Sequence, residues 1–329
     1  MPTRIVFTGK QAIALHQYAV PTPGPGQVLT RTRYSLMSTG TENIVFNRNF
    51  DPGTNWDKWV KYPFNAGYLN VGVVEAIGAG VTGWSVGDVA VSREGHGSHE
   101  LLDVSDVRVN KLPAGIDHKN ATWFGLAKIA SMGARVAGFE LGQSVAIVGA
   151  GPVGQMATRW AAAAGVGRLV VIDPVQMRLD MAKRGGATAT ISQPAGEASD
   201  ALKSACDGKL PSVLIDTTGH PAVFAAALPL IADFGRLVLL GDAGSPSQQR
   251  LTGDVINRGL TIVGAHDIHE SPRWDSRKSF AAFSHLVLAG RFNLDGLITH
   301  TFKPEQAADA YRIANEKRAE TMGILFDWT

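Results

Sequence analysis

The feature that most constrains this chain is a glycine motif placed between an apolar run and a helical stretch. Residues 145–148 are apolar, residues 149–154 read G-A-G-P-V-G, and a second apolar run at 169–172 ends in Asp173. Glycine tolerates the positive φ angles of a tight turn and lets backbone N–H groups approach a pyrophosphate at a helix N-terminus. In this order of strand, turn, helix, strand and acid, the motif predicts a βαβ unit that binds a dinucleotide.

The acid at the end of the second strand bears on which dinucleotide is bound. Asp173 would accept hydrogen bonds from the two ribose hydroxyls of NAD and repel the 2′-phosphate of NADP, so we expect NAD. Arg178 is a counter-indication, since an arginine beyond the acid can meet a 2′-phosphate. Ligands of such sheets lie at the carboxyl ends of strands, which adds the residues that follow the fourth and fifth strands. The expected cofactor-binding residues are Gly149, Gly151, Pro152, Val153, Gly154, Asp173, Arg178, Thr217, Thr218, Gly219, Gly241, Asp242 and Ala243.

Hydrophobic periodicity divides the chain into two parts. Residues 1–118 have the pattern of short strands separated by turns, with strands expected at 4–7, 12–16, 28–34, 70–77 and 89–92. From about residue 120, helices alternate with apolar strands expected to end at Val148, Ile172, Ile191, Asp216, Leu240 and near Gly264. Helices at 276–290 and 304–318 and a strand at 323–327 complete the chain. The pattern predicts an α/β fold, with a doubly wound Rossmann parallel sheet and a separate β-rich domain.

Bulk composition limits the kinds of partner. The chain has 329 residues, a net charge of +2 and 18% charged residues, without runs of like charge. It has no stretch of about 18 apolar residues and no signal-peptide pattern at its start. We therefore expect a cytoplasmic protein with a small-molecule substrate and neither a nucleic acid nor a membrane partner. The single cysteine, Cys206, excludes an intramolecular disulfide and a multi-cysteine metal site.

Several segments in sequence order resemble the medium-chain dehydrogenase/reductase superfamily. They are residues 23–28, 72–78, 86–91, the glycine motif, 298–302 and 307–311. Residues 38–42 and 294–300 further resemble the bacteriochlorophyllide-a dehydrogenase branch. The resemblance implies a GroES-like domain of residues 1–119 and 292–329, a Rossmann domain of residues 120–291, and a homodimer formed through the strand at 260–264.

The chain departs from the zinc-dependent members of that superfamily at their metal-ligand positions. Thr39 stands where they have the Cys of a Cys-Gly-Thr-Asp motif, Tyr68 stands for the His of Gly-His-Glu, and the third position falls at Phe124 or Gly125. The cysteines of their structural zinc lobe are missing too. A catalytic zinc needs about three N, S or O ligands from the protein. We therefore expect neither zinc ion.

Without a metal, a side chain must handle the oxygen of the reacting alcohol or carbonyl. We expect the catalytic residues to be Lys128, Tyr68, Thr41 and Glu42. Lys128 stands in an Ala-rich apolar helical stretch, and an ammonium in a dry pocket has a lowered proton affinity. The alternatives are that Lys128 reaches solvent or touches only the cofactor, that Tyr68 fills the vacated metal pocket, and that Thr41 and Glu42 cap a helix.

Three further clusters keep two interpretations each. A loop or substrate-edge role competes with metal binding for His96, His99 and Glu100. A loop role competes with acid–base chemistry for His266, Asp267 and His269. Packing under a loop competes with a wall for a ring-shaped substrate in the aromatic cluster Trp56, Trp59 and Tyr62.

Together these observations favour a zinc-independent, NAD-dependent dehydrogenase. It would oxidise a secondary alcohol, or reduce the ketone, by hydride transfer to or from the nicotinamide. The substrate would be a cyclic polyol, a sugar, or a macrocycle that carries a hydroxyethyl group. The alternatives are a zinc-free quinone or enone reductase and a non-catalytic nucleotide-sensing protein.

Overall fold

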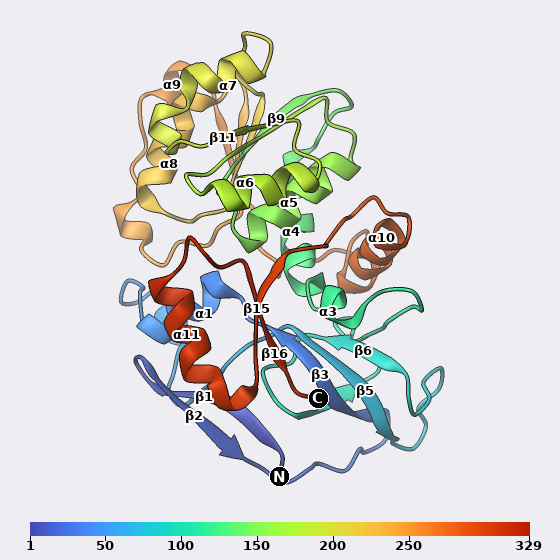
Figure 1. Cartoon of the computed structure of the whole chain (residues 1–329). Coiled ribbons are helices and arrows are strands. Elements are labelled where there is room, and N and C mark those ends of the chain that lie inside the picture. The colour runs from blue at the N-terminus through green and yellow to red at the C-terminus, as the bar shows by residue number, and fades with distance from the viewer.

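A six-stranded parallel sheet forms the upper half of the molecule in Figure 1. The computed structural model describes all 329 residues. The strands of this sheet are, in spatial order, β11 (Ala189–Ile191), β10 (Arg168–Ile172), β9 (Ser144–Val148), β12 (Val213–Asp216), β13 (Arg236–Leu239) and β14 (Thr261–Gly264). The chain runs outward from β9 through β10 to β11 and then returns to the other side of β9 at β12. The doubly wound crevice therefore opens between β9 and β12.

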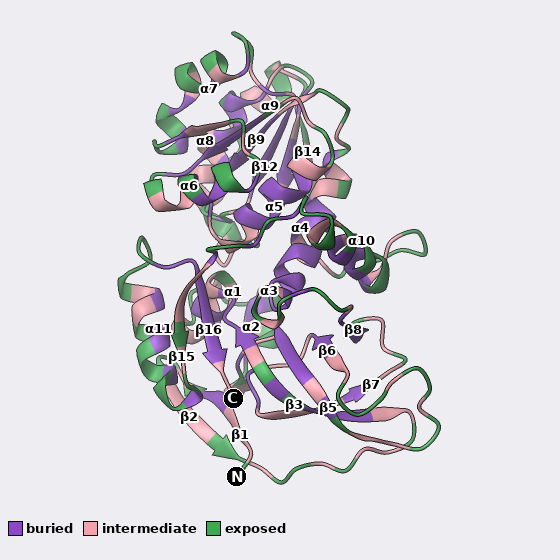
Figure 2. Ribbon diagram, turned by 45° about the vertical axis from the view of Figure 1, so that its right-hand side comes forward, coloured by how far each residue is buried: buried purple, intermediate pink, exposed green.

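Helices cover both faces of this sheet, which is why its strands read as nearly continuous apolar runs. Val145 and Ile147 of β9 pack into one cluster with α4 (Phe124–Ala137), α5 (Pro152–Ala163), α6 (Gln176–Arg184) and α10 (Ser276–Leu288). Ala146 and Val148 face a second cluster with α7 (Ser199–Ala205) and α8 (Pro221–Ala227). The short α9 (Asp254–Asn257) precedes β14. Figure 2 shows these strands and α4 as mainly buried.

The lower half is β-rich and combines both ends of the chain (Figure 1). Its larger sheet contains β15 (Ile298–Phe302), β16 (Gly323–Asp327), β3 (Gln27–Leu36), β5 (Asn70–Ile77), β6 (Val89–Ser92) and β8 (Asn110–Lys111), with β7 (His99–Asp103) paired to β3. A smaller sheet holds β2 (Ala12–Gln17), β1 (Thr3–Gly9) and β4 (Phe64–Asn65). The antiparallel pairing of β16 with β3 joins the C-terminal segment to the N-terminal part.

Helix α4 links the two halves. Leu126 and Ala130 belong to the same buried cluster as Ile147 of the parallel sheet and as Leu69 and Val71 of the β-rich half. The remaining helices are α1 (Thr39–Asn47), α2 (Asn55–Trp59), α3 (His118–Ala121) and α11 (Ala307–Glu316). This shared core fixes the distance between the strand ends of one half and α1 of the other.

The expected fold class is confirmed, and most differences lie at element ends. The parallel strands end where predicted, except that β13 ends one residue earlier, at Leu239. A 3-10 turn, Pro304–Gln306, precedes α11, which ends at Glu316 instead of at residue 318. Helix α2 was not expected, because it has only five residues, and α1 was expected only under the alternative in which Thr41 and Glu42 cap a helix. None of the helices is both long and apolar enough to cross a bilayer.

Candidate active site

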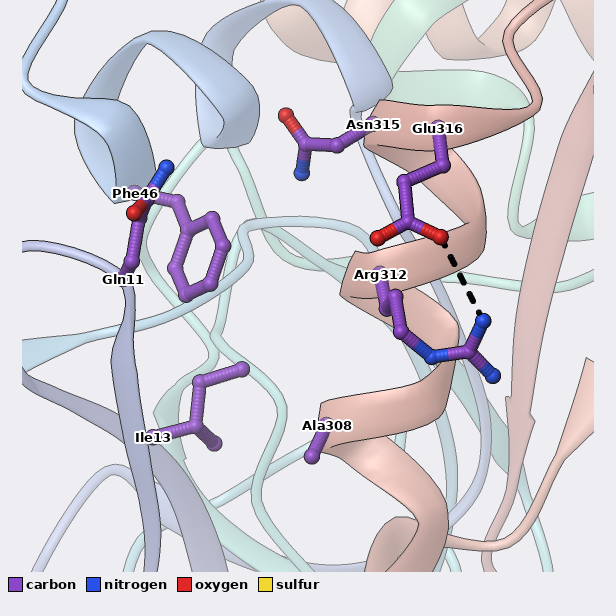
Figure 3. A pocket seen from close by; sticks show the side chains of 7 residues that line it. All are labelled: Gln11, Ile13, Phe46, Ala308, Arg312, Asn315 and Glu316. Carbon is purple, nitrogen blue, oxygen red and sulfur yellow. Dashed lines mark hydrogen bonds and ion pairs between the residues drawn. The ribbon is translucent and has the colours of Figure 1, made fainter.

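A cavity of about 1380 Å³ lies between the strand ends of the parallel sheet and helices α1 and α2. Residues from both halves line it, including Gly151 and Asp173 on one side and Thr41 and Tyr68 on the other. A second cavity of about 490 Å³ lies beside α11 and is shown in Figure 3. Its charged groups, Arg312 and Glu316, are 3.5 Å apart and pair with each other. The larger cavity, called the cleft below, is therefore the candidate site.

The glycine motif has the backbone geometry that a pyrophosphate requires. Gly149 has a φ of 90°, and a Cβ at Gly154 would lie 2.0 Å from the carbonyl oxygen of Gly149, so both positions need glycine. A Cβ at Gly151 would meet no atom within 4 Å, because this side of the turn faces open space. No side chain caps the N-terminus of α5, which leaves its first N–H groups free for an anion. The residues present therefore fit a dinucleotide.

Asp173 lies in the same cleft at the end of β10. Its carboxylate is only 5% exposed and accepts hydrogen bonds from the N–H groups of Ala150, at 2.7 Å, and Val175, at 2.8 Å. The guanidinium of Arg178 lies 3.9 Å from it and donates to the carbonyl of Arg318. Burial lowers the pKa of Arg178, against the raising effect of the Asp173 carboxylate. The acid is thus held in place by the glycine turn itself.

The structure places all the expected cofactor residues along the cleft except Gly219. A Cβ at Gly219 would lie 2.6 Å from the carbonyl oxygen of Asp242, and its φ is 63°. Gly219 therefore allows two strand-end loops to pack together without itself lining the space. His220 and Val223 also line this end of the cleft, and the sequence pattern did not single them out.

Three hydroxyl groups meet at the opposite end of the cleft. The Tyr68 hydroxyl lies 2.5 Å from the Ser38 hydroxyl and 3.4 Å from the Thr41 hydroxyl. Burial raises the pKa of Tyr68, while the nearby Arg93 guanidinium lowers it. Tyr68 is therefore protonated near neutral pH and can donate a hydrogen bond to a ligand oxygen. Ser38 is the first residue of the 38–42 segment that carries part of the family resemblance, but the sequence interpretation gave it no role.

Glu42 lies beside these three hydroxyls, but its carboxylate binds other partners. Its buried carboxylate accepts a hydrogen bond from the Ser38 N–H at 2.7 Å and another from the Tyr311 hydroxyl, and lies 3.1 Å from Nε2 of His96. His96 is itself buried and lies 2.8 Å from the Ser35 hydroxyl. Of the two interpretations of Glu42, the geometry favours the one in which it caps the start of α1. His96 has a packing role.

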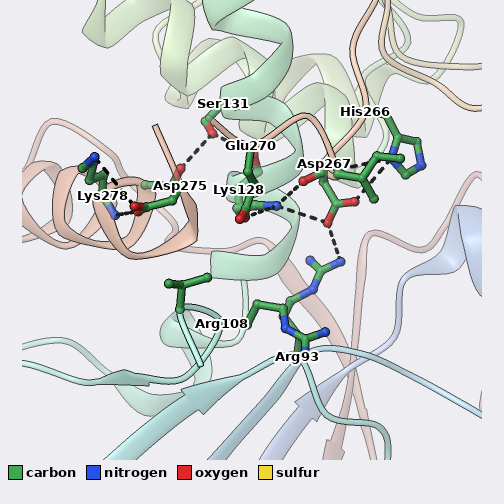
Figure 4. Close-up of polar contacts among 12 residues, drawn as sticks. Arg93, Arg108, Lys128, Ser131, His266, Asp267, Glu270, Asp275 and Lys278 are labelled. Carbon is green, nitrogen blue, oxygen red and sulfur yellow. Dashed lines mark hydrogen bonds and ion pairs between the residues drawn. The ribbon is translucent and has the colours of Figure 1, made fainter. Parts of the chain in front are cut away.

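Lys128 does not join Tyr68 and Thr41. It is buried on α4, does not line the cleft, and donates to the carbonyl of Asp267. Its ammonium lies 3.0 Å from the Glu270 carboxylate and 3.6 Å from that of Asp267 (Figure 4). The loop after β14 thus supplies the partners of Lys128. The sequence could not show that these carboxylates fold back onto α4.

Arg93, which the sequence interpretation did not include, lines the cleft. Its guanidinium donates to the Gly125 carbonyl at 3.1 Å. It also donates to the Asp267 carboxylate at 2.8 Å (Figure 4). The guanidinium carbon lies 4.5 Å from the centroid of the Tyr68 ring, a cation–π geometry. A lone arginine after a strand carries no sequence signal, so only the fold reveals this contact.

The side chains at the expected zinc-ligand positions do not fit a catalytic zinc. Thr39, Tyr68 and either Phe124 or Gly125 offer no His, Cys or carboxylate, and nowhere in the chain do three or more such side chains form a potential metal cluster. A Cβ at Gly125 would lie 2.0 Å from a methyl carbon of Leu69 and 3.0 Å from a guanidinium nitrogen of Arg93. Neighbouring side chains thus occupy the space that a ligand at position 125 would need.

Aromatic residues form the outer wall of this end of the cleft. Trp56 and Trp59 both line it, with ring centroids 5.7 Å apart, and Trp59 is 53% exposed. Tyr62 instead donates to the carbonyl of Val45 at 2.6 Å, so it holds the segment in place. His266, Asp267 and His269 line the cleft as well. Burial raises the pKa of Asp242, which lies beside this wall.

The known proteins to which this chain is similar are dehydrogenases. Residues 152–277 match the family described as zinc-binding dehydrogenase. The chain is 29% identical to the L-threonine 3-dehydrogenase of Bacillus velezensis over 87% of each chain. It is 25% identical to the D-guloside 3-dehydrogenase of Escherichia coli strain K12, over 98% of this chain and 99% of the relative.

Solved structures share the whole fold. An alcohol dehydrogenase of Escherichia coli CFT073, in complex with NADH, superposes with a TM-score of 0.82 at 20% identity and 99% coverage of both chains. Galactitol-1-phosphate dehydrogenase of Escherichia coli gives a TM-score of 0.83 at 19% identity, again with 99% coverage of both chains. At about 20% identity, the likeness to these solved structures shows that the chain shares their fold.

Proposed function

We propose that this protein is a zinc-independent, NAD-dependent dehydrogenase that oxidises a secondary alcohol or reduces the corresponding ketone. The observation that carries the proposal is the shared cleft. It joins a pyrophosphate turn and Asp173 at one end with the three neighbouring hydroxyls of Tyr68, Ser38 and Thr41 at the other. The family match and the two 3-dehydrogenase relatives support the same class of reaction.

The nicotinamide, when bound, accepts a hydride from the carbinol carbon as the C–O bond becomes a carbonyl. The protein must then remove the hydroxyl proton. In the proposed path this proton moves to the Tyr68 oxygen while the Tyr68 proton passes to Ser38, 2.5 Å away, and from there into the cleft. Glu42 keeps Ser38 in place by accepting its N–H. Thr41 supplies a second hydroxyl beside the same oxygen.

NAD is the proposed cofactor because the Asp173 carboxylate is fixed at the ribose end of the cleft. A 2′-phosphate would bring two further negative charges towards this buried acid. Arg178 lies 3.9 Å from this acid and donates to the Arg318 carbonyl, so its charge is already partly offset by Asp173.

The proposed substrate is a cyclic polyol or sugar. The exposed ring of Trp59 provides a flat apolar surface in the wall of the cleft, which suits the face of a hydroxylated ring. The names of the two sequence relatives, L-threonine 3-dehydrogenase and D-guloside 3-dehydrogenase, both describe dehydrogenation at a carbon that bears a secondary hydroxyl. A macrocycle with a hydroxyethyl group is the second substrate class to test.

Cofactor titration followed by a substrate screen tests the proposal. Tryptophan fluorescence with NADH and NADPH should show tighter binding of NADH. Turnover should follow with NAD on a panel of cyclic polyols, glycosides, L-threonine and hydroxyethyl macrocycles. Activity confined to quinones or enones with NADPH, or cofactor binding without any turnover, would contradict it.

We also propose a homodimer formed through β14. This strand pairs only with β13, and none of its four residues is buried, so one edge of the parallel sheet lacks a partner. Light scattering at micromolar concentration should give the mass of two chains. A single-chain mass would contradict the dimer while leaving the proposed reaction untouched.

A further inference from the structure

The Arg93 guanidinium is a cation in the wall of the cleft. It lies over the ring of Tyr68, which stands at one zinc-ligand position of the zinc-dependent relatives, and against the carbonyl of Gly125, one of the two candidates for another. Its side chain is 17% exposed, so it is held in the wall and still open to the cleft. We propose that Arg93 stabilises the negative charge that develops on the substrate oxygen. This inference rests on the proposed function.

The guanidinium is oriented before any ligand arrives. One terminal nitrogen donates to Gly125 and the other to Asp267, and these are its only hydrogen bonds within the protein. An arginine has five N–H donors in a rigid planar fork, so donors remain for an oxygen in the cleft. A donor fixed in advance stabilises developing charge without reorganisation during the reaction.

Arg93 belongs to a cluster of two cations and two carboxylates. Asp267 is shared between Arg93 and Lys128, and Lys128 is shared between Asp267 and Glu270. His266 lies 3.6 Å from the Asp267 carboxylate, and Glu42 is bound to Ser38, Tyr311 and His96. Asp267 therefore holds Arg93 in place and is itself held by Lys128. Lys128 therefore has a positioning role. It does not line the cleft and acts on Arg93 through Asp267.

The chemistry requires no proton transfer to or from Arg93. The substrate O–H bond breaks, its proton enters the Tyr68–Ser38 path, and the hydride leaves the carbinol carbon for the oxidised nicotinamide. Arg93 stays protonated throughout and favours the alkoxide-like state in oxidation, and the polarised carbonyl in reduction. Tyr68 donates to the same oxygen. Loss of a fixed donor of this kind costs about 100-fold to 1000-fold in kcat.

Two substitutions of similar size separate charge from packing. R93Q removes the charge and R93K keeps it. We expect kcat to fall about 100-fold in R93Q and much less in R93K, with the Kd for NADH unchanged in both. In R93A, added guanidinium ion should restore part of the lost kcat. The matched control is R135M, because Arg135 also lies over an aromatic ring, 4.2 Å from the Trp274 centroid, but is exposed and outside the cleft.

A readout that does not need turnover keeps the inference separate from the proposed function. The difference in ultraviolet absorbance between wild type and Y68F reports ionisation of the Tyr68 phenol, which faces Arg93, Glu42, Ser38 and Thr41. R93Q should move this ionisation to higher pH and R135M should not. If no alcohol is turned over but the shift appears, the proposed reaction fails while the Arg93 charge still acts in the cleft.

Specific results would overturn the proposal. They are an unchanged kcat in R93Q, an unchanged Tyr68 titration in R93Q, or equal losses in R93Q and R93K without guanidinium rescue. Should R93A or R93Q fail to fold, measurements on R93K and D267N test the proposal instead. Under the proposal, R93K keeps most of its activity, and D267N lowers kcat without weakening NADH binding. Loss of NADH binding in D267N would assign the cluster a purely structural role.

Discussion

The two ends of the cleft are built in different ways. The cofactor end consists mainly of backbone, from Gly149 to Gly154 and from the loops that follow β12 and β13. The opposite end consists of side chains from distant segments: Ser38, Tyr68, Arg93 and Asp267. The first follows from a local motif, whereas the second exists only after the two halves have packed around α4. The comparison predicts that substitutions at the two ends affect different kinetic constants.

The largest expected effect is at the substrate end. In Y68F, the hydroxyl that contacts Ser38 and the substrate oxygen is lost, so kcat should fall about 100-fold to 10,000-fold while the Kd for NADH stays constant. Steady-state kinetics and fluorescence titration measure the two quantities.

The matched control for this substitution is Y62F. Tyr62 donates to the carbonyl of Val45 and does not line the cleft, so its loss should cost about 1 kcal/mol of stability and leave kcat unchanged. If Y68F and Y62F behave alike, Tyr68 has no role in the chemistry.

The second effect is at the cofactor end. D173N keeps an oxygen acceptor but loses the charge, so KM for NAD should rise about 10-fold to 100-fold with little change in kcat. The preference for NAD over NADP should narrow, because the repulsion of a 2′-phosphate is removed. A fall in kcat at saturating NAD would break the proposed division between the two ends.

A smaller effect is expected for Lys128, which lies behind the substrate end. K128M leaves Asp267 and Glu270 without their shared partner, so the melting temperature should fall and KM for the alcohol should rise. The change in kcat should be only a few-fold, because Arg93 still has Asp267. A loss of kcat as large as in Y68F, at unchanged KM, would return Lys128 to a catalytic role.

The smallest effect on activity is expected outside both ends, at Glu100. Burial raises the pKa of Glu100 to about 8, with a further contribution from Glu94. Between about pH 4.5 and about pH 8, Glu100 therefore keeps a proton in the folded state that it releases in the unfolded state. The free energy of unfolding consequently falls as the pH rises through this range. In E100Q this decline should be shallower, with kcat unchanged. Urea unfolding at several pH values measures it, and equal slopes in both proteins would contradict the assignment.

The difference between the two ends of the cleft also explains which parts of the fold and site were predictable from the sequence. The strand ends and the glycine turn depend on local periodicity and on φ angles that only glycine adopts easily, so the fold class and most of the cofactor end were predictable. Lys128 attracted attention as a lone charge in an apolar helix. Its partners lie on a loop more than 130 positions later, and no local pattern connects them.

The substrate end of the cleft also depends on contacts that no local sequence pattern reveals. Tyr68 was identified only by its position in the family resemblance, Ser38 was part of that resemblance without a predicted role, and Arg93 was not identified at all. Their proximity depends on how α1, the loop after β6 and α4 meet in the folded chain. At Gly125, one of the two candidates for the third ligand position, the missing side chain leaves space that Leu69 and Arg93 fill.

Metal content measured alongside turnover tests the central claim most directly, namely that protein side chains handle the substrate oxygen. The purified enzyme should be treated with a strong chelator, analysed for divalent metals by mass spectrometry, and assayed with NAD and its best alcohol substrate. We expect substoichiometric metal and undiminished kcat. Stoichiometric zinc in the untreated protein, with activity abolished by the chelator and restored by added zinc, would contradict the account.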